Sequence, residues 1–281
     1  MKSVKVGDRV GVGAQVGADL TCGNCKSDNE NYCPNQIDTY GATYPDGVMS
    51  QGGFSSHIRV HEYFVFPIPD SIDSKVAAPM MCAGLTVYSP LVRLGCGPGK
   101  KVAICGMGGL GHFAVQFAKA LGADVTVLSH TANKEQDAKK MGADNFVNTT
   151  EKEWYKPYDF TFDFILNCAD VIEGFDLPSF FSTLKVHGKF HCVGLSGTPL
   201  PELTAGSFAR NGNYIGTSHI GSRPEALAML ELASKSNVTT WLQTVPISEK
   251  GCAEAVQAIS DNTVRYRYVL TDFDKQFGKR D

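Results

Sequence analysis

Three cysteines near the start of the chain have the spacing of a metal-binding loop. Two residues separate Cys22 from Cys25, seven separate Cys25 from Cys33, and Asp19 stands three residues before Cys22. Zinc takes four tetrahedral ligands, among which cysteine thiolates are common and carboxylate oxygens are accepted, though harder. The pattern therefore predicts a structural zinc site made by Cys22, Cys25 and Cys33, with Asp19 as the candidate fourth ligand.

Other interpretations of this cluster stay open. Cys22 and Cys25 could form a redox dithiol, but such a pair usually opens a helix in a thioredoxin-like setting, which the surrounding sequence lacks. The cysteines could also be plain free thiols. Asp19 could be an ordinary surface aspartate in a loop, a position that needs no metal to explain it.

A glycine cluster further along the chain has the pattern of a dinucleotide-binding turn. It follows an apolar stretch at 101–105 and opens a stretch of helical periodicity at 112–121, which is the context that gives the pattern meaning. In such a turn the first glycine permits the tight bend, the second lets a pyrophosphate approach the backbone, and the third allows close helix–strand packing. The alternative is an ordinary strand–helix turn. The residues of the pattern are Gly106, Gly108, Gly109, Leu110 and Gly111.

The end of the next predicted strand indicates which dinucleotide binds. NAD-binding proteins usually place Asp or Glu there, about 20 residues after the glycines. This chain has Ser129 followed by His130 and Thr131, with Lys134 five residues past Ser129. Without a carboxylate to repel a 2′-phosphate, the hydroxyls and Lys134 predict NADP. Alternatively, Lys134 is a solvated lysine on the first turn of a surface helix.

The periodicity around these motifs predicts an α/β protein with a parallel sheet. Residues 1 to about 75 are turn-rich and read as a small β-rich unit, and strands then alternate with helices of about ten residues, as in βαβ units. We expect strands in the first part at 9–12, 57–60 and 63–66. We expect later strands at 101–105, 125–128, 162–166, 189–193 and 264–271, and helices at 76–94, 112–121, 134–141, 224–234 and 249–260.

Composition excludes several classes of function. The chain has 281 residues, enough for about two domains, and a net charge of −3, which argues against a nucleic-acid binder or a polybasic membrane-surface protein. Apolar residues make up 43% and charged residues 20%, as in globular proteins. We expect neither a transmembrane helix nor a secretory signal. The odd number of cysteines, nine, predicts a reducing, cytoplasmic setting.

Taken together, these motifs resemble the zinc-containing medium-chain alcohol dehydrogenases, in particular the NADP-dependent cinnamyl-alcohol-dehydrogenase-like branch of the fungal type. The resemblance covers almost the whole chain and includes the segments 78–88 and 264–270 besides the two motifs above. It implies a Rossmann doubly wound parallel sheet and a partial GroES-like β-rich catalytic domain. We expect residues 76–237 to form the NADP-binding domain, and 1–75 with 238–281 the catalytic domain.

The resemblance also implies roles for individual residues. Cys82 corresponds to a ligand of the catalytic zinc, Thr86 to a residue near the nicotinamide, and Arg267 to a residue that reaches the cofactor's pyrophosphate. Asp19 stands where the family has the first of four structural cysteines. Without the resemblance, Cys82 would be read as a buried helical cysteine. Arg265 and Arg267, on one face of the last predicted strand, would be solvent-facing.

The resemblance further implies catalytic-zinc ligands that this chain does not show. The family's other cysteine and its histidine lie in a part that would precede Met1, and His61 with Glu62 is a poor substitute because no glycine precedes the pair. We therefore expect about 80 N-terminal residues to be missing, the catalytic zinc to be incomplete, and an apolar scar where that part would pack.

The resemblance implies an enzyme that interconverts small-molecule alcohols and aldehydes with NADP(H), with zinc as a further cofactor and a homodimer as the expected assembly. Activity in this short form is in doubt. The alternatives are a non-catalytic dinucleotide-binding protein and a zinc-independent NADPH reductase.

Overall fold

The computed structural model describes residues 4–169, 175–195, 197, 199–261 and 263–278. Their contacts divide the chain into unit 1, formed by Met1–Leu85 with Ile220–Asp281, and unit 2, formed by Thr86–His219. The first segment of unit 1 ends at Leu85, later than the expected boundary after 75, and the second begins at Ile220, earlier than the expected boundary after 237. The reason is packing within unit 1. Helix α2 (Ser74–Pro79) contacts strand β14 (Arg267–Thr271), and helix α8 (Arg223–Ser236) contacts strand β6 (Val65–Pro67).

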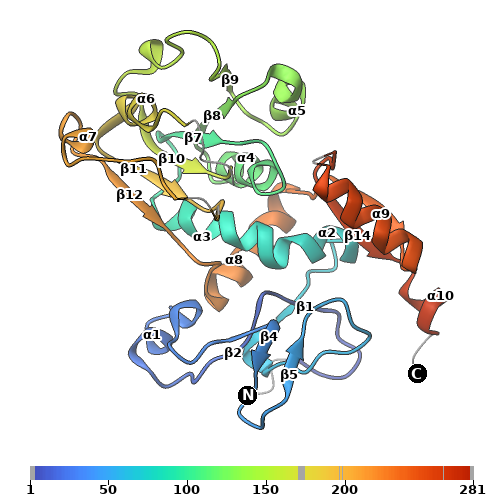
Figure 1. Cartoon of the computed structure of the whole chain (residues 1–281). Coiled ribbons are helices and arrows are strands. Elements are labelled where there is room, and N and C mark those ends of the chain that lie inside the picture. The colour runs from blue at the N-terminus through green and yellow to red at the C-terminus, as the bar shows by residue number, and fades with distance from the viewer. Residues whose placement is uncertain (1–3, 170–174, 196, 198, 262, 279–281) are drawn as a thin grey trace. The chain divides into compact units, whose positions relative to one another are not determined.

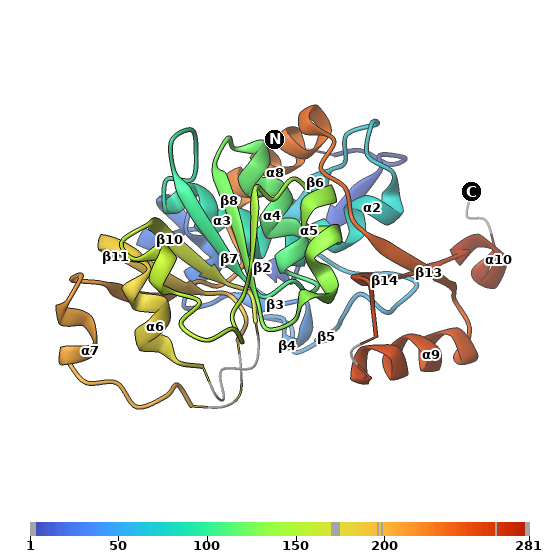
Figure 2. The ribbon, with the colours of Figure 1, turned by 90° about the horizontal axis from the view of Figure 1, so that it is seen from above.

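Unit 2 is built on one six-stranded parallel sheet (Figures 1 and 2). The strand order β12-β11-β10-β7-β8-β9 puts the first strand of the unit in the middle, with successive strands added first on one side and then on the other. This is the dinucleotide-binding order, in which ligands bind where the order reverses, between β7 and β10. The strands are β7 (Lys101–Cys105), β8 (Asp124–Ser129), β9 (Asn145–Asn148), β10 (Phe162–Asn167), β11 (Leu184–Cys192) and β12 (Tyr214–Thr217).

The helices of unit 2 pack against this sheet. Helix α4 contacts β7 and β8, α5 contacts β9, and α6 contacts β11. Phe113 and Phe117 on α4 are fully buried and stack with ring centroids 6.1 Å apart, and Ile104 on β7 is likewise fully buried. The helices are α3 (Leu85–Arg93, starting in unit 1), α4 (Gly111–Ala120), α5 (Glu135–Lys140), α6 (Leu177–Ser182) and α7 (Gly206–Ala209).

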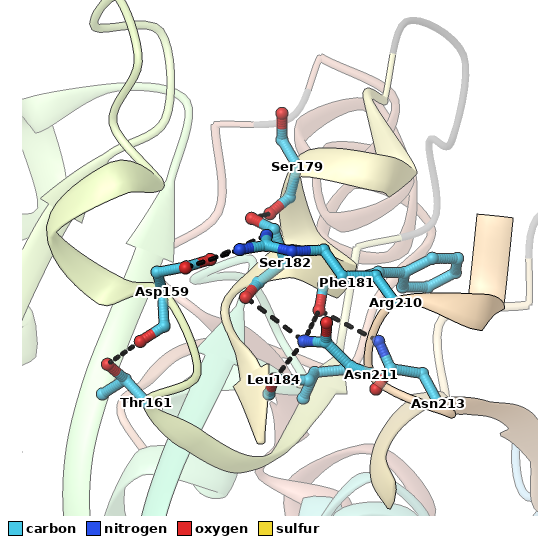
Figure 3. Close-up of polar contacts among 9 residues, drawn as sticks. All are labelled: Asp159, Thr161, Ser179, Phe181, Ser182, Leu184, Arg210, Asn211 and Asn213. Carbon is cyan, nitrogen blue, oxygen red and sulfur yellow. Dashed lines mark hydrogen bonds and ion pairs between the residues drawn. The ribbon is translucent and has the colours of Figure 1, made fainter. Parts of the chain in front are cut away.

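Buried amides fix the edge of the sheet, as Figure 3 shows. The Nδ2 of Asn211 donates to the carbonyl of Phe181 at 3.1 Å, and the Nδ2 of Asn213 donates to the same carbonyl at 2.9 Å. These bonds help to satisfy a carbonyl of the last turn of α6, where the regular hydrogen bonds of the helix end. Next to Asn211, the exposed side chains of Arg210 and Asp159 form a bidentate ion pair with N–O distances of 2.8 and 2.6 Å.

Unit 1 consists of small two-stranded sheets and helices. Three of its sheets are antiparallel pairs: β1 with β6, β2 with β3, and β4 with β5. The fourth, β13 with β14, is parallel. The strands are β1 (Val10–Val12), β2 (Gln15–Gly17), β3 (Ile37–Asp38), β4 (Tyr40–Thr43), β5 (Met49–Gln51), β6 (Val65–Pro67), β13 (Leu242–Pro246) and β14 (Arg267–Thr271). The helices and turns are α1 (Gly23–Lys26), η1 (Glu30–Tyr32), η2 (Glu62–Phe64), α2 (Ser74–Pro79), the π-helical turn η3 (Met80–Gly84), α8 (Arg223–Ser236), α9 (Glu249–Ser260) and α10 (Phe273–Phe277).

The first part of unit 1 exposes large apolar side chains. Phe54 is 91% exposed, and Val48 and Met49 at the β4–β5 hairpin are each more than half exposed. Two sequence expectations are wrong in this unit. Residues 57–60 form no strand, and the last strand begins at Arg267, so Arg265 lies before it.

One helical stretch bears on the expectation that the chain has no transmembrane helix. By length and composition alone, Ser74–Arg93 is apolar enough to cross a membrane, with a mean hydropathy of 1.2. However, 61% of its most apolar window is buried inside the protein. A core helix meets the same criterion, so the stretch carries no membrane assignment.

Candidate functional site

The structure brings the four predicted metal ligands together in unit 1. One ligand atom from each of Asp19, Cys22, Cys25 and Cys33 lies within 4.8 Å of all the others. Cys22 precedes α1 and Cys25 lies within it, so the short helix presents both thiols to one side, and η1 leads the chain back to Cys33. This is the only such group of three or more ligands among the residues that the structure describes.

The spacing of these atoms fits a tetrahedral zinc ion. Zn–S bonds of about 2.3 Å place tetrahedral sulfurs about 3.8 Å apart, and a Zn–O bond near 2.0 Å places oxygen about 3.5 Å from sulfur. The Cys22 Sγ lies 3.5 Å from Cys25 Sγ and 4.0 Å from Cys33 Sγ. The Asp19 Oδ1 lies 3.5 Å from Cys25 Sγ. Four protein ligands leave no open position, as in structural rather than catalytic zinc sites.

The surroundings of the cluster favour the anionic form of two of its ligands, Asp19 and Cys22. The backbone N–H groups of Cys22 and Thr21 donate to Asp19 Oδ1 at 3.0 and 2.9 Å and hold the pKa of this carboxyl well below its usual range. The N–H of Cys25 donates to the Cys22 sulfur and lowers the pKa of that thiol. Burial raises the pKa of Cys25, a cost that a bound cation would offset, because metal ligands bind deprotonated.

The glycine turn of unit 2 has the stereochemistry that its motif predicts. Gly106 has φ +89°, and a Cβ there would lie 2.9 Å from the backbone nitrogen of Ala169. A Cβ on Gly111 would lie 1.9 Å from the Gly106 carbonyl oxygen. By contrast, no protein atom lies within 4 Å of a Cβ built on Gly108. The turn is therefore closed on the protein side and open at Gly108, where a pyrophosphate would approach.

Two further glycine-turn residues open helix α4. Leu110 has helical backbone angles at the N-cap position, and the N–H of His112 bonds the Gly108 carbonyl at 3.1 Å. The carbonyl oxygen of Gly109 lies 3.0 Å from Nδ1 of the His112 ring. The first turn of α4 therefore begins at the glycine turn, where the helix dipole favours an anion.

At the end of β8, the two predicted NADP residues take different positions. Lys134 is half-buried and donates to the carbonyl of Met107 at 2.7 Å, so its charge lies beside the glycine turn. Ser129 is buried, and its hydroxyl donates to the carbonyl of Thr131 at 3.0 Å. The Ser129 hydroxyl is thus used locally and keeps only acceptor capacity, whereas the Lys134 ammonium places a positive charge beside the turn.

Cys82 lies on the π-helical turn η3, and its side chain is exposed. The interpretation as a buried helical cysteine is therefore wrong, and π-turns inside helices are frequent at functional sites. Thr86 follows in α3 and is half-buried. Around Cys82, burial raises the pKa of Tyr40, and the Cys82 charge adds to that rise.

Arg267 begins β14 and is half-buried, so it is not a solvent-facing arginine. Burial lowers the pKa of its guanidinium, and the neighbouring charge of Cys82 opposes that shift. A half-buried cation beside an exposed thiol is consistent with a ligand-binding surface.

The histidines that could complete a catalytic zinc site have other roles. His61 Nδ1 accepts the N–H of Tyr63 at 3.2 Å and caps η2. His191 bonds the Ser218 hydroxyl at 2.9 Å, and burial lowers its pKa. Among the described residues, no group of three or more possible metal ligands includes Cys82. A catalytic zinc needs three protein ligands and an open position, so we derive no reaction step through such an ion.

The sequence analysis missed the residues that support these sites. Asn35 donates to Asp19 Oδ2 at 3.2 Å, and its N–H contacts the Cys33 sulfur at 3.3 Å. Glu30, between Cys25 and Cys33, is 1% exposed. No sequence pattern identifies either residue, because their partners come from other parts of the loop and the chain.

Comparisons with known proteins give a consistent result. The family model of the alcohol dehydrogenase GroES-like domain matches residues 1–70, and that of the zinc-binding dehydrogenases matches residues 109–235. A curated relative, NADP-dependent alcohol dehydrogenase 6 of Saccharomyces cerevisiae, is 43% identical over 98% of this chain and 76% of its own length. The chain belongs to the zinc-binding alcohol dehydrogenase family.

Solved structures of family members agree in fold. A cinnamyl alcohol dehydrogenase from Sorghum bicolor superposes with a TM-score of 0.89 at 35% identity, covering 99% of this chain and 78% of that one. The enzyme CAD of Helicobacter pylori, solved as a complex with NADP(H), has a TM-score of 0.85 at 31% identity, covering 96% and 76%. The Rossmann-like parallel sheet and the β-rich GroES-like part are both confirmed.

Proposed function

We propose that this chain is an NADP(H)-dependent oxidoreductase that interconverts a small alcohol and its aldehyde. The observation that carries the proposal is the glycine turn, closed at Gly111, open at Gly108 and flanked by Lys134 without a carboxylate at the end of β8. Both NADP-named relatives cited above support the choice of cofactor. When bound, NADPH supplies the hydride.

The chain's own residues bind and orient this cofactor. The amides of the α4 first turn bind the pyrophosphate at Gly108, and the turn residues Gly109 and Leu110 present them. Lys134 binds the 2′-phosphate, with Ser129 fixing the turn that carries it. Thr86 and Arg267 serve as further cofactor contacts, the first near the nicotinamide and the second at the pyrophosphate.

The zinc content follows from the two cysteine regions. Asp19, Cys22, Cys25 and Cys33 hold one structural zinc ion. Cys82 is the remaining ligand for a catalytic ion. We assign unit 1 to the catalytic domain and unit 2 to the NADP domain, in place of the boundaries expected from sequence. We also propose a homodimer that pairs at the exposed edge strand β12. A cytoplasmic location is supported by the nine cysteines, none of which forms a disulfide.

The direct test is a binding titration followed by a turnover assay. NADPH is expected to bind the purified chain at least tenfold more tightly than NADH, followed by intrinsic fluorescence. Oxidation of NADPH with cinnamaldehyde then measures activity. Equal binding of both cofactors would refute the NADP assignment.

The second candidate is a non-catalytic dinucleotide-binding protein. It is favoured by one observation: among the described residues, no group of three or more possible metal ligands includes Cys82. NADPH binding without aldehyde-dependent oxidation supports it. Turnover that persists after complete removal of zinc supports instead a zinc-independent reductase.

A further inference from the structure

The loop that carries the metal ligands is tied to the start of a helix far along the chain. Glu30 lies in η1 between Cys25 and Cys33, and its side chain is 1% exposed. Its Oε1 accepts the backbone N–H of Arg223, the first residue of α8. The two residues are 193 positions apart in the sequence, and both belong to unit 1.

Contacts from Gln15 and Arg223 also stabilise this junction. Gln15 Nε2 donates to the backbone carbonyl of Glu30 at 2.9 Å, and Gln15 itself is buried. The Arg223 guanidinium donates to the carbonyls of Tyr63 and Val65, the latter at 3.0 Å, and lies 5.2 Å from the Tyr63 ring centroid. The metal-binding loop therefore contacts β2 and the start of α8, and the start of α8 also contacts η2 and β6.

The charge of Glu30 makes this junction more than a packing contact. A buried carboxylate is costly unless it is hydrogen-bonded or paired. Oε1 is satisfied by an N–H at the positive end of the α8 dipole, whereas Oε2 is buried without a hydrogen-bond partner in the part of the chain that the structure describes. The start of α8 is thus the group that compensates Glu30, and displacing it would strand a buried charge.

The start of α8 also lies close to the point where the chain returns from unit 2 to unit 1. Unit 1 resumes at Ile220, only three residues before α8 begins at Arg223. Ser222 and Glu225 form a capping box that fixes the entry of the chain into the helix. Any change in the position of Glu30 therefore acts on the segment through which the chain re-enters unit 1.

We propose that Glu30 is a positioning residue that couples zinc binding in the loop to the order of the first turn of α8. This inference rests on the proposed structural zinc site. Zinc fixes Cys25 and Cys33, and these fix the η1 turn that lies between them. Glu30 then holds the N–H of Arg223. Because such coupling is reciprocal, an ordered α8 start must also tighten zinc binding by the same factor.

Hydrogen exchange on the full chain tests the coupling. Exchange at the Arg223 amide is measured with zinc bound and after removal of zinc by a chelator, in the unchanged chain, in Glu30→Ala and in Glu30→Gln. Zinc is expected to slow this amide about tenfold in the unchanged chain and not at all in Glu30→Ala. Glu30→Gln keeps an oxygen that accepts the N–H and should retain most of the effect.

Zinc affinity, measured by competition with a chromophoric chelator, supplies the reciprocal readout. Glu30→Ala should lower the affinity about tenfold, whereas Glu231→Ala, which removes an exposed pair with Lys235 on the same helix, should leave it unchanged. Zinc binding without any change at the Arg223 amide of the unchanged chain would overturn the coupling alone. Failure of the unchanged chain to bind zinc would overturn the metal site as well.

Discussion

The two units of the molecule reach their functional geometry by different means. In unit 2, a single parallel sheet with a fully buried core fixes the glycine turn, and backbone atoms already crowd Gly106 and Gly111. In unit 1, the sheets have only two strands each, and Phe54 is 91% exposed. Its metal loop gathers a carboxylate and three thiols within 4.8 Å.

The two sites therefore obtain their stability from different sources. The cofactor turn is determined by packing, so it should persist without its ligand. The metal loop concentrates anionic ligands, so its order depends on the cation that neutralises them. The chain's two tryptophans can report on the units separately, because Trp154 lies in unit 2 and Trp241 in unit 1.

The largest expected effect separates two glycines of the same turn. Gly111→Ala would force a Cβ against the Gly106 carbonyl, and we expect unit 2 to lose about 3 kcal/mol or more of stability together with NADPH binding. Gly108→Ala should leave the Trp154 unfolding transition unchanged and weaken NADPH binding alone, since its Cβ meets only open space. Equal loss of stability in both variants would contradict the packing account.

Removal of zinc is the matching perturbation of unit 1. Chelation, or Cys22→Ser, should destabilise unit 1 by about 4 kcal/mol, the value for a ligand at a thousandfold its Kd. Denaturant titrations that follow Trp241 should shift, while the Trp154 transition stays within error. A shift of both transitions by the same amount would remove the distinction between the two units.

Lys134 tests which part of the cofactor the turn recognises. Lys134→Ala removes an ammonium bound to the Met107 carbonyl and should weaken NADPH about tenfold, or about 1.4 kcal/mol, while NADH affinity changes little. Lys140→Ala, an exposed lysine of α5, is the control. An equal loss for both cofactors would show that Lys134 stabilises the turn rather than binding a 2′-phosphate.

The smallest expected effect concerns Asp163, a partly buried carboxylate near the start of strand β10. Burial raises the pKa of Asp163, but hydrogen bonds from Lys185 at 2.8 Å and from the Lys101 N–H at 2.9 Å outweigh it, and the net pKa is lowered. Asp163 therefore adds stability above the usual Asp pKa of about 3.9, which is lost as the pH falls through the lower folded value.

Asp163→Asn should accordingly cost unit 2 about 1 kcal/mol at neutral pH and progressively less below about pH 4. Urea unfolding of both proteins at several pH values, followed by Trp154, measures the difference. A cost that does not depend on pH would show that the hydrogen-bond geometry, and not the charge, is what Asp163 supplies.

The local motifs were predictable from sequence because neighbouring residues encode them. The glycine turn needs only one strand, one bend and one helix, and the cysteine loop needs only its own spacing. The strand Lys101–Cys105 and the helix Glu249–Ser260 were predicted with their observed bounds for the same reason.

Features that depend on distant partners could not be predicted. Strand β9 (Asn145–Asn148) is polar at both ends, and β12 (Tyr214–Thr217) is an exposed edge, so neither shows the apolar run that marks a buried strand. The exposure of Cys82 follows from a π-turn that periodicity does not reveal. The bond from Arg223 to Glu30 joins elements whose proximity only the fold determines.

A metal count on the purified 281-residue chain tests the central claim most directly. We predict one zinc ion per chain, lost in Cys22→Ser and retained in Cys82→Ser, because the four-ligand cluster is complete and, among the described residues, no other group of three or more possible ligands includes Cys82. Two zinc ions per chain, with one of them lost in Cys82→Ser, would contradict it.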